Sequence, residues 1–194
     1  MSEHLHGPKA KIIAFVGLTG SGKSTAVDYM TKKGYPKVYF GGVIYKAMDE
    51  AGIEITPKSQ QVFREEIREK EGKDFVVTRI IQEIHDLIDS GQRRIVADGL
   101  YTWTEYKLLK HEFPGELTTI AIVAPKHLRY RRLSQRPERP FTEAEAVQRD
   151  WSEIENLEKG GPIAIADYYI TNNDDLDHFY KQLDDAAEHA GFYE

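Results

Sequence analysis

The sequence predicts an α/β fold in which helices cover both faces of a five-stranded parallel sheet. Five short apolar runs have strand length, at 11–16, 37–40, 93–98, 117–124 and 167–171. Stretches with apolar residues at every third or fourth position lie between them, as in helices. Strands that alternate with helices form parallel sheets. A length of 194 residues with 40% hydrophobic residues is typical of one domain, here spanning residues 1–194.

The first strand and helix enclose a glycine-rich loop. The run "KIIAFV" ends at Gly17, and "KSTAVDYMTKKG" (23–34) follows as a predicted helix. Between them, "GLTGSGKS" satisfies G-x-x-x-x-G-K-[ST]. In this pattern the backbone N–H groups converge on an anion, the lysine reaches the outer phosphates, and the hydroxyl binds magnesium. We predict a nucleoside triphosphate site formed by Gly17, Thr19, Gly20, Ser21, Gly22, Lys23, Ser24 and Thr25.

The segment between the second and third strands is longer than one crossover needs. It carries three helical patterns, from which we predict an acceptor-binding lobe at 42–91. Arg64 and Arg68 are four residues apart, share a helix face, and could bind an acidic acceptor. The neighbouring glutamates give an alternative, an exposed helix stabilised by its own salt bridges.

The third strand ends in an aspartate followed by glycine. Ligands of parallel sheets bind at the carboxyl ends of the strands, so we expect Asp98 to hold magnesium together with Ser24, or to orient an acceptor hydroxyl. The alternative is a strand-terminal aspartate that starts a turn. Tyr45 and Tyr101 fall near the same edge and are candidates for an aromatic acceptor platform, although such residues also form ordinary core.

A basic stretch follows the fourth strand. Arg132 and Arg136 share a helix face, and Arg139 stands between two prolines in a predicted lid at 137–142. We expect these three arginines to neutralise the transferring phosphoryl group, with closure of the lid excluding water. The alternative is a solvated basic face that pairs with the acidic segment "TEAEA".

Net charge, cysteine content and the length of apolar runs exclude several classes of protein. A net charge of −6 disfavours nucleic-acid binding through a broad basic surface, and the absence of cysteine excludes disulfides and thiolate metal sites. No apolar run approaches the roughly 18 residues of a membrane span, and the polar start "MSEHLHGPKA" lacks a signal-peptide pattern. We expect a cytoplasmic protein with a small-molecule acceptor and no membrane partner. The sequence predicts no oligomeric state.

The loop, "IVADG", "RYRRLSQRPERP" and "ADYYITNND" together resemble the P-loop nucleoside monophosphate kinase-like superfamily over nearly the whole chain. More closely, "GYPKVYFGGVIYKAMDEAG", "IVADGLYTWTEYKLLKHEFP" and "GGPIAIADYYITNN" are similar to adenylate-kinase-related ATPases of archaea and some bacteria. Dephospho-CoA kinase resembles the chain more distantly. The resemblance implies ATP and Mg²⁺ as co-substrates and places Asn172 near the adenine.

The chain departs from adenylate kinases where they grip the acceptor monophosphate. Two expected arginines are missing, and Gly42, Tyr45 and Tyr101 stand near their places. An acceptor with a hydroxyl group is therefore favoured over a monophosphate. We expect transfer of the γ-phosphoryl group of Mg·ATP to a nucleotide or nucleoside-like acceptor. The alternatives are a dephospho-CoA kinase and an ATP-hydrolysing regulator that acts through a protein partner.

Overall fold

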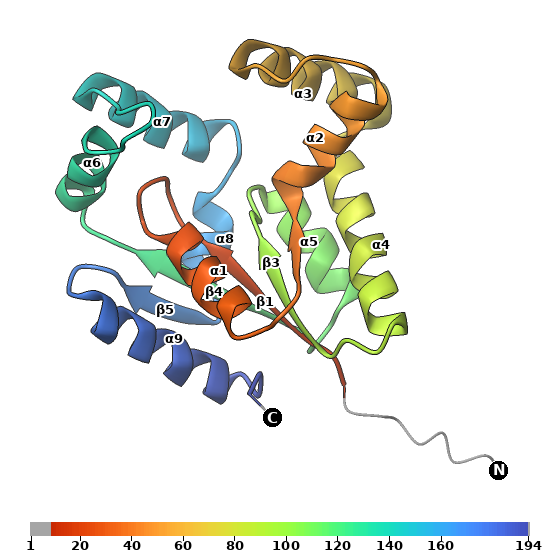
Figure 1. Cartoon of the computed structure of the whole chain (residues 1–194), viewed down its shortest axis with the longest axis vertical. Coiled ribbons are helices and arrows are strands. Elements are labelled where there is room, and N and C mark those ends of the chain that lie inside the picture. The colour runs from red at the N-terminus through yellow and green to blue at the C-terminus, as the bar shows by residue number, and fades with distance from the viewer. Residues whose placement is uncertain (1–8, 194) are drawn as a thin grey trace.

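The computed structural model describes residues 9–193, except for the side chains of 57, 58 and 61. Five parallel strands form one sheet in the order β2-β3-β1-β4-β5, which confirms the predicted fold class (Figure 1). The strands are β1 (Lys11–Val16), β2 (Lys37–Tyr39), β3 (Arg94–Asp98), β4 (Leu117–Val123) and β5 (Tyr168–Thr171). The helices are α1 (Lys23–Lys32), α2 (Phe40–Glu50), α3 (Pro57–Glu71), α4 (Phe75–Asp89), α5 (Trp103–Glu112), α6 (Lys126–Ser134), α7 (Glu143–Glu155), α8 (Gly160–Ala164) and α9 (Leu176–His189).

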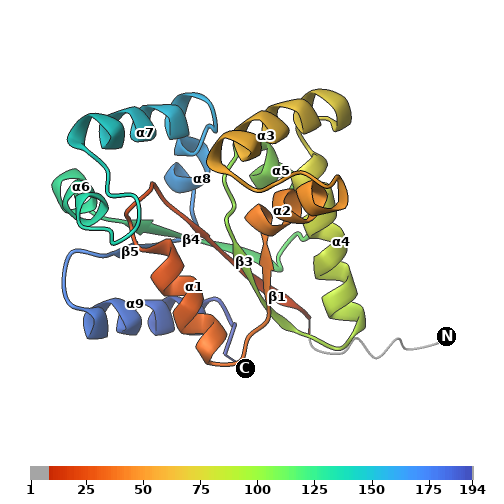
Figure 2. The same ribbon diagram turned by 45° about the horizontal axis from the view of Figure 1, so that its top comes forward.

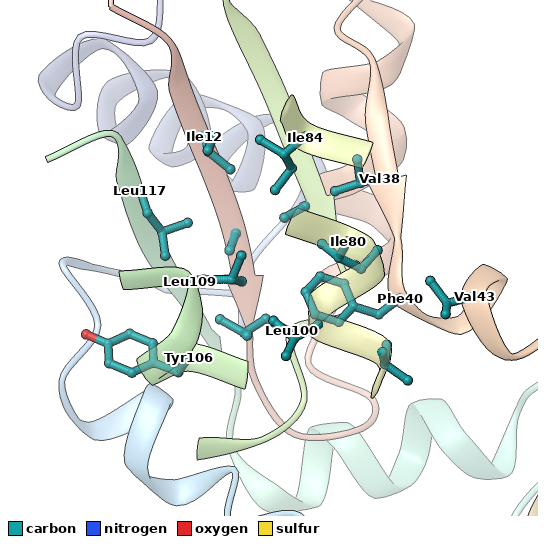
Figure 3. Close-up of a cluster of buried hydrophobic side chains, with 14 of the residues drawn as sticks. Ile12, Val38, Phe40, Val43, Ile80, Ile84, Leu100, Tyr106, Leu109 and Leu117 are labelled. Atoms are coloured by element: carbon teal, nitrogen blue, oxygen red, sulfur yellow. The ribbon is translucent and has the colours of Figure 1, made fainter. Parts of the chain in front are cut away.

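The central strand β1 is buried on both faces, which explains its continuous apolar run. Ile13 and Phe15 point into a cluster with α1 and α9. Ile12, Ala14 and Val16 point to the other face, into a cluster to which α2, α4 and α5 contribute. Figure 3 shows this second cluster, where Ile12 lies among side chains of β2, β4 and the covering helices. The two clusters fix the sheet between its helical layers.

Two helical arms stand at the carboxyl end of the sheet, on either side of the loop that follows β1 (Figures 1 and 2). One arm consists of α2 and α3, and the other of α6 and α7. Although 42–91 was predicted as one lobe, α4 covers the sheet, with Ile80 and Ile84 fully buried. The arms therefore frame the strand ends where the predicted site residues lie.

Local sequence sets where the helices begin and end. Helix α1 stops two residues before its predicted end, because Gly34 adopts a positive φ of 96°. Helix α7 begins at a capping box, in which the Glu145 amide donates to Thr142 Oγ1 and the Thr142 amide donates to the Glu145 carboxylate. Within the described part of the chain, every helix is too short or too polar to cross a bilayer.

Candidate active site

The loop between β1 and α1 needs glycine at particular places. Gly17 has φ 153°, and a Cβ there would lie 2.5 Å from the Ile122 carbonyl oxygen. Gly22 has φ 112°, and a Cβ there would collide with the side-chain amide of Asn172. The loop thus runs so close to the ends of β4 and β5 that only glycine fits at these two positions.

Thr19 is held from both sides by the α6–α7 arm. Its amide donates to Glu153 Oε2 at 3.0 Å, and its carbonyl accepts from Arg129 Nη1 at 3.1 Å. Arg129 in turn forms a buried bidentate pair with Asp150, at 2.7 and 2.6 Å. We call these contacts of Thr19 the loop clamp. The clamp fixes the loop conformation. Arg129 therefore has a structural role in the loop.

A cavity of about 390 Å³ opens beside the loop. Five basic side chains line it, and among its described lining residues they face one carboxylate, that of Glu153. The surface therefore suits a polyanion. The lining residues are Thr19, Gly20, Gly22, Lys23, Ser24, Thr25, Tyr101, Arg132, Arg136, Arg149, Glu153 and Lys159.

Lys23 is turned onto the loop backbone. Its Nζ donates to the carbonyl oxygens of Gly17 at 2.7 Å and Leu18 at 3.2 Å. Burial and, to a lesser extent, the nearby Lys159 lower the pKa of Lys23 to about 7, against the opposing effect of Glu153. An incoming anion would favour the charged form, so the lysine is poised to respond to phosphate.

Glu153 is a buried carboxylate with several donors. Lys159 Nζ lies 2.8 Å from its Oε1, and Arg149 Nε lies 3.1 Å from the same oxygen. Burial by itself would raise the pKa of Glu153, but Lys159 and the Thr19 donors outweigh burial and hold it at about 2. Glu153 therefore stays ionised and joins the loop, α7 and the start of α8.

The predicted lid arginines differ in placement. Arg132 lines the cavity and donates to the Asn172 carbonyl at 2.7 Å, while the Asn172 side chain donates to the Ser21 carbonyl at 2.8 Å. Arg136, which directly precedes the predicted lid, also lines the cavity. Arg139 is exposed at φ 52° and is not among the described residues that line this cavity. In this conformation the structure brings two of the three arginines to the loop.

The two predicted cation ligands, Ser24 and Asp98, lie at the start of α1 and at the end of β3. Ser24 lines the cavity from the start of α1. Asp98 ends β3 and lies 3.5 Å from Lys37 Nζ, and burial raises its pKa more than Lys37 lowers it. One hydroxyl and one carboxylate fit the one or two protein ligands that Mg²⁺ takes beside substrate phosphates.

A second cavity, of about 150 Å³, adjoins the first. Tyr101 and Arg149 line both, so the two cavities meet at these side chains. We call the second cavity the inner chamber. It is lined by Phe40, Gly41, Ile44, Arg64, Arg68, Val76, Tyr101, Glu105, Arg149 and Leu157.

The arginines of the inner chamber carry unused donors. Among the described residues, neither Arg64 nor Arg68 has a carboxylate within salt-bridge distance or a hydrogen bond. The alternative of a salt-bridged helix is therefore wrong for this pair. Tyr45 was predicted to contact the acceptor, but its ring packs 6.5 Å from that of Tyr39, and it lines neither cavity in the described part of the chain.

Sequence reasoning missed three residues of the site: Arg149, Glu153 and Lys159. Arg149 and Glu153 are four residues apart, a spacing that indicates a shared helix face and nothing about a partner. No recognised motif contains them. Their contacts with the loop come from tertiary folding.

The chain matches a family model described as an AAA domain, over residues 13–159. It is also similar to UPF0200 proteins of archaea. The protein of Thermococcus sibiricus is 30% identical over 93% of this chain and 95% of its own length. That of Sulfurisphaera tokodaii is 32% identical, covering 90% and 94% respectively.

Solved structures of two kinases and of the protein TT1252 share the fold. A dephospho-CoA kinase from Campylobacter jejuni has a TM-score of 0.60 at 18% identity, covering 92% of this chain and 96% of its own. A shikimate kinase from Bacteroides thetaiotaomicron has a TM-score of 0.57 at 14% identity, covering 93% and 98%. TT1252 from Thermus thermophilus has a TM-score of 0.62 at 17% identity, covering 94% and 98%. At such identities these likenesses concern the fold.

Proposed function

Because the chain belongs to the AAA domain family and to the UPF0200 proteins, and has a P-loop kinase-like fold, we propose that it is an ATP-dependent small-molecule kinase. One observation carries the proposal: a polybasic cavity beside the phosphate loop meets a second chamber at Tyr101 and Arg149. Two joined cavities accommodate a phosphoryl donor and an acceptor. A protein that only hydrolyses ATP needs no second chamber.

The first cavity binds the triphosphate of ATP. The loop amides and the N-terminus of α1 hold the β-phosphate, and Lys23 leaves its backbone acceptors to contact the outer phosphates. Arg132 and Arg136 neutralise charge on the transferring group. Asn172 lies against the loop at Ser21, and the resemblance to nucleoside monophosphate kinases implies that it lies near the adenine.

Ser24 and Asp98 would hold Mg²⁺, which supplies charge neutralisation at the β- and γ-phosphates. The protein itself aligns the reactants. Attack by an acceptor oxygen on the γ-phosphorus forms one P–O bond and breaks the bond to the β–γ bridging oxygen. The electron pair of the broken bond leaves with ADP, and the acceptor proton is released to water. Closure of the arms around the reactants would exclude competing water.

The acceptor lies in the inner chamber and is a nucleotide or nucleoside-like molecule with a hydroxyl group. Arg64 and Arg68 supply unpaired guanidinium groups for an anionic substituent, and Phe40, Ile44 and Val76 supply an apolar wall. Proteins of this fold include dephospho-CoA kinase, shikimate kinase and a gluconokinase, so a coenzyme precursor or hydroxy acid belongs in the same test.

The test is ADP release from Mg·ATP against nucleosides, nucleoside monophosphates, dephospho-CoA, shikimate and gluconate, with Lys23→Ala as the blank. We expect one compound to stimulate the wild-type protein strongly, and Lys23→Ala to lose several kcal/mol of transition-state stabilisation. A slow rate that no compound changes, or equal rates for wild type and Lys23→Ala, would overturn the kinase assignment. A rate that rises only with a protein partner would favour the regulator.

The arginines of the inner chamber are tested by a double substitution. We expect Arg64→Ala/Arg68→Ala to raise the KM for the acceptor by about 10–100-fold, because the anion loses two charge-assisted hydrogen bonds. Basal ATP hydrolysis without acceptor should change little. Lys70→Ala, on the same helix but paired with Glu71 outside the chamber, is the matched control. An unchanged KM in the double variant would remove both arginines from the acceptor site.

The closer relationship to adenylate-kinase-related ATPases is part of this proposal. It rests on the stretches around β2, β3 and β5, and on the arrangement of Asp98 and Asn172 at the strand ends. It predicts measurable ATP hydrolysis when no acceptor is present. Failure to detect this basal hydrolysis would count against the relationship. It would not affect the separate test of acceptor-stimulated phosphoryl transfer.

A further inference from the structure

A second lysine lies in the triphosphate cavity. Lys159 precedes α8 and is only 3% exposed, yet it lines the cavity together with Lys23. Its Nζ lies 2.8 Å from Glu153 Oε1 and 4.9 Å from the centre of the Tyr101 ring. An ammonium group is costly to bury, and such burial is rare without a partner or a role.

Lys159 lies at the junction of the triphosphate cavity and the inner chamber, where the transferring phosphoryl group would lie. Tyr101 lines both the triphosphate cavity and the inner chamber, so a cation above its ring lies where donor and acceptor meet. Lys23 contacts the carbonyls of Gly17 and Leu18, on the loop side of the same cavity. The two lysines thus approach the cavity from different elements.

Glu153 determines the orientation of Lys159. Its Oε1 accepts from Lys159 and Arg149, and its Oε2 accepts from the Thr19 amide. The carboxylate is 1% exposed and is itself fixed by the loop clamp. Because Glu153 is itself fixed, it holds the Lys159 ammonium group in one orientation. Electrostatic stabilisation of a transition state requires such preorganised charges.

We propose that Lys159 is a second catalytic lysine, which contacts the γ-phosphoryl group during transfer, and that Glu153 is its positioning residue. This inference rests on the proposed kinase function. Lys159 remains an ammonium group throughout and neither gives nor takes a proton. It stabilises the charge that spreads over the γ-phosphoryl oxygens as the bond to ADP breaks and the bond to the acceptor oxygen forms.

If the Glu153–Lys159 ion pair had only a structural role, its substitution would have a different outcome. Removing one member would leave a buried charge uncompensated, whereas replacing both members by neutral groups restores stability in many buried pairs. Because Glu153 also accepts from Thr19 and Arg149, the double variant is compared with Glu153→Gln alone. If the pair is only structural, adding Lys159→Met to Glu153→Gln should not lower kcat further. If Lys159 acts on the phosphoryl group, kcat should fall further.

The experiment compares Lys159→Met, Glu153→Gln and the double variant Glu153→Gln/Lys159→Met with the full-length wild-type protein. For each we measure kcat and KM of Mg·ATP-dependent ADP release, affinity for a fluorescent ATP analogue, and melting temperature. Lys181→Met is the control, since Lys181 forms a surface pair with Asp185. We expect Lys159→Met to lower kcat by about 100-fold or more, with nucleotide affinity weakened by less than about tenfold.

The double variant decides between the two interpretations. We expect its kcat to lie more than about threefold below that of Glu153→Gln alone, and it carries the test if Lys159→Met alone does not fold. A kcat of Lys159→Met within about threefold of wild type, or of the double variant within about threefold of Glu153→Gln, would overturn the inference. The variant Lys23→Ala distinguishes failure of the Lys159 inference from failure of the proposed kinase function. If Lys23→Ala is as fast as wild type, the kinase assignment and the inference fail together. If only the Lys159 variants are fast, the inference alone fails.

Discussion

The altered pKa of Lys23 predicts that the affinity for ATP depends on pH. With a pKa of about 7 in the free protein, about half of the Lys23 side chains are charged at pH 7 and about one in eleven at pH 8. ATP adds negative charge at the site, and so binds to the charged form. If charging precedes binding, the apparent dissociation constant should rise about fivefold between pH 7 and pH 8.

The assay is displacement of a fluorescent nucleotide at fixed ionic strength and excess magnesium. Lys23→Arg is the matched control, because arginine stays charged across this range and its affinity should be nearly constant. Affinity that is constant to within about twofold in the wild type would refute the reasoning, and so would an equal pH dependence in Lys23→Arg.

The same pKa has a consequence for stability without nucleotide. The folded-state pKa of Lys23 lies below its ordinary value of 10.5, so between pH 7 and that value the unfolded chain binds the proton more tightly. Stability rises with pH wherever the unfolded state holds more protons. The contribution of Lys23 to the free energy of unfolding should therefore increase from pH 7 upward, and Lys23→Arg should lack this increase in urea titrations.

Three further substitutions probe the site. Gly22→Ala should lower the free energy of unfolding by about 1–3 kcal/mol in urea titrations and abolish nucleotide binding, since it combines a positive φ with a steric overlap. Gly115→Ala, with φ 84° and open space around it, controls for backbone strain, and an equal cost there would disprove the overlap. Asp150→Ala should cost about 3–5 kcal/mol, because Arg129 stays buried without a partner, and an unchanged urea midpoint would contradict this. Arg139→Ala should alter kcat by less than about twofold, as the residue is exposed, whereas a tenfold loss would indicate that the lid closes over the cavity.

The fold was accessible from the sequence because its determinants are local. Each strand is a short apolar run, and the loop motif has a defined neighbourhood between a strand and a helix. The same locality explains the placement of Asp98, which ends β3, and of Lys23, which the motif places at the start of α1. Arg64 and Arg68 were also identified correctly as a shared face, because helical spacing alone determines it.

The remaining site residues depend on contacts between distant segments. Thr19 and Glu153 are 134 positions apart, and no spacing rule connects them. Tyr45 was predicted from its position soon after the second strand. Helix α2 begins at Phe40 and carries the Tyr45 ring beside Tyr39, so proximity in sequence to a strand end did not place it in either cavity of the described structure. Arg129 belongs to the same basic stretch as Arg132 and Arg136, but its partner is the buried Asp150, which no local pattern identifies.

The loop clamp also bears on how this protein can be recombined with related ones. The Thr19 carbonyl accepts a hydrogen bond from Arg129 of α6, and the Thr19 amide donates one to Glu153 of α7. The loop and that arm therefore have to be exchanged together. A chimera that exchanges only 17–24 would keep the motif but lose the partners that shape it. Exchanging 17–24 together with 126–159 should transfer a working phosphate site intact.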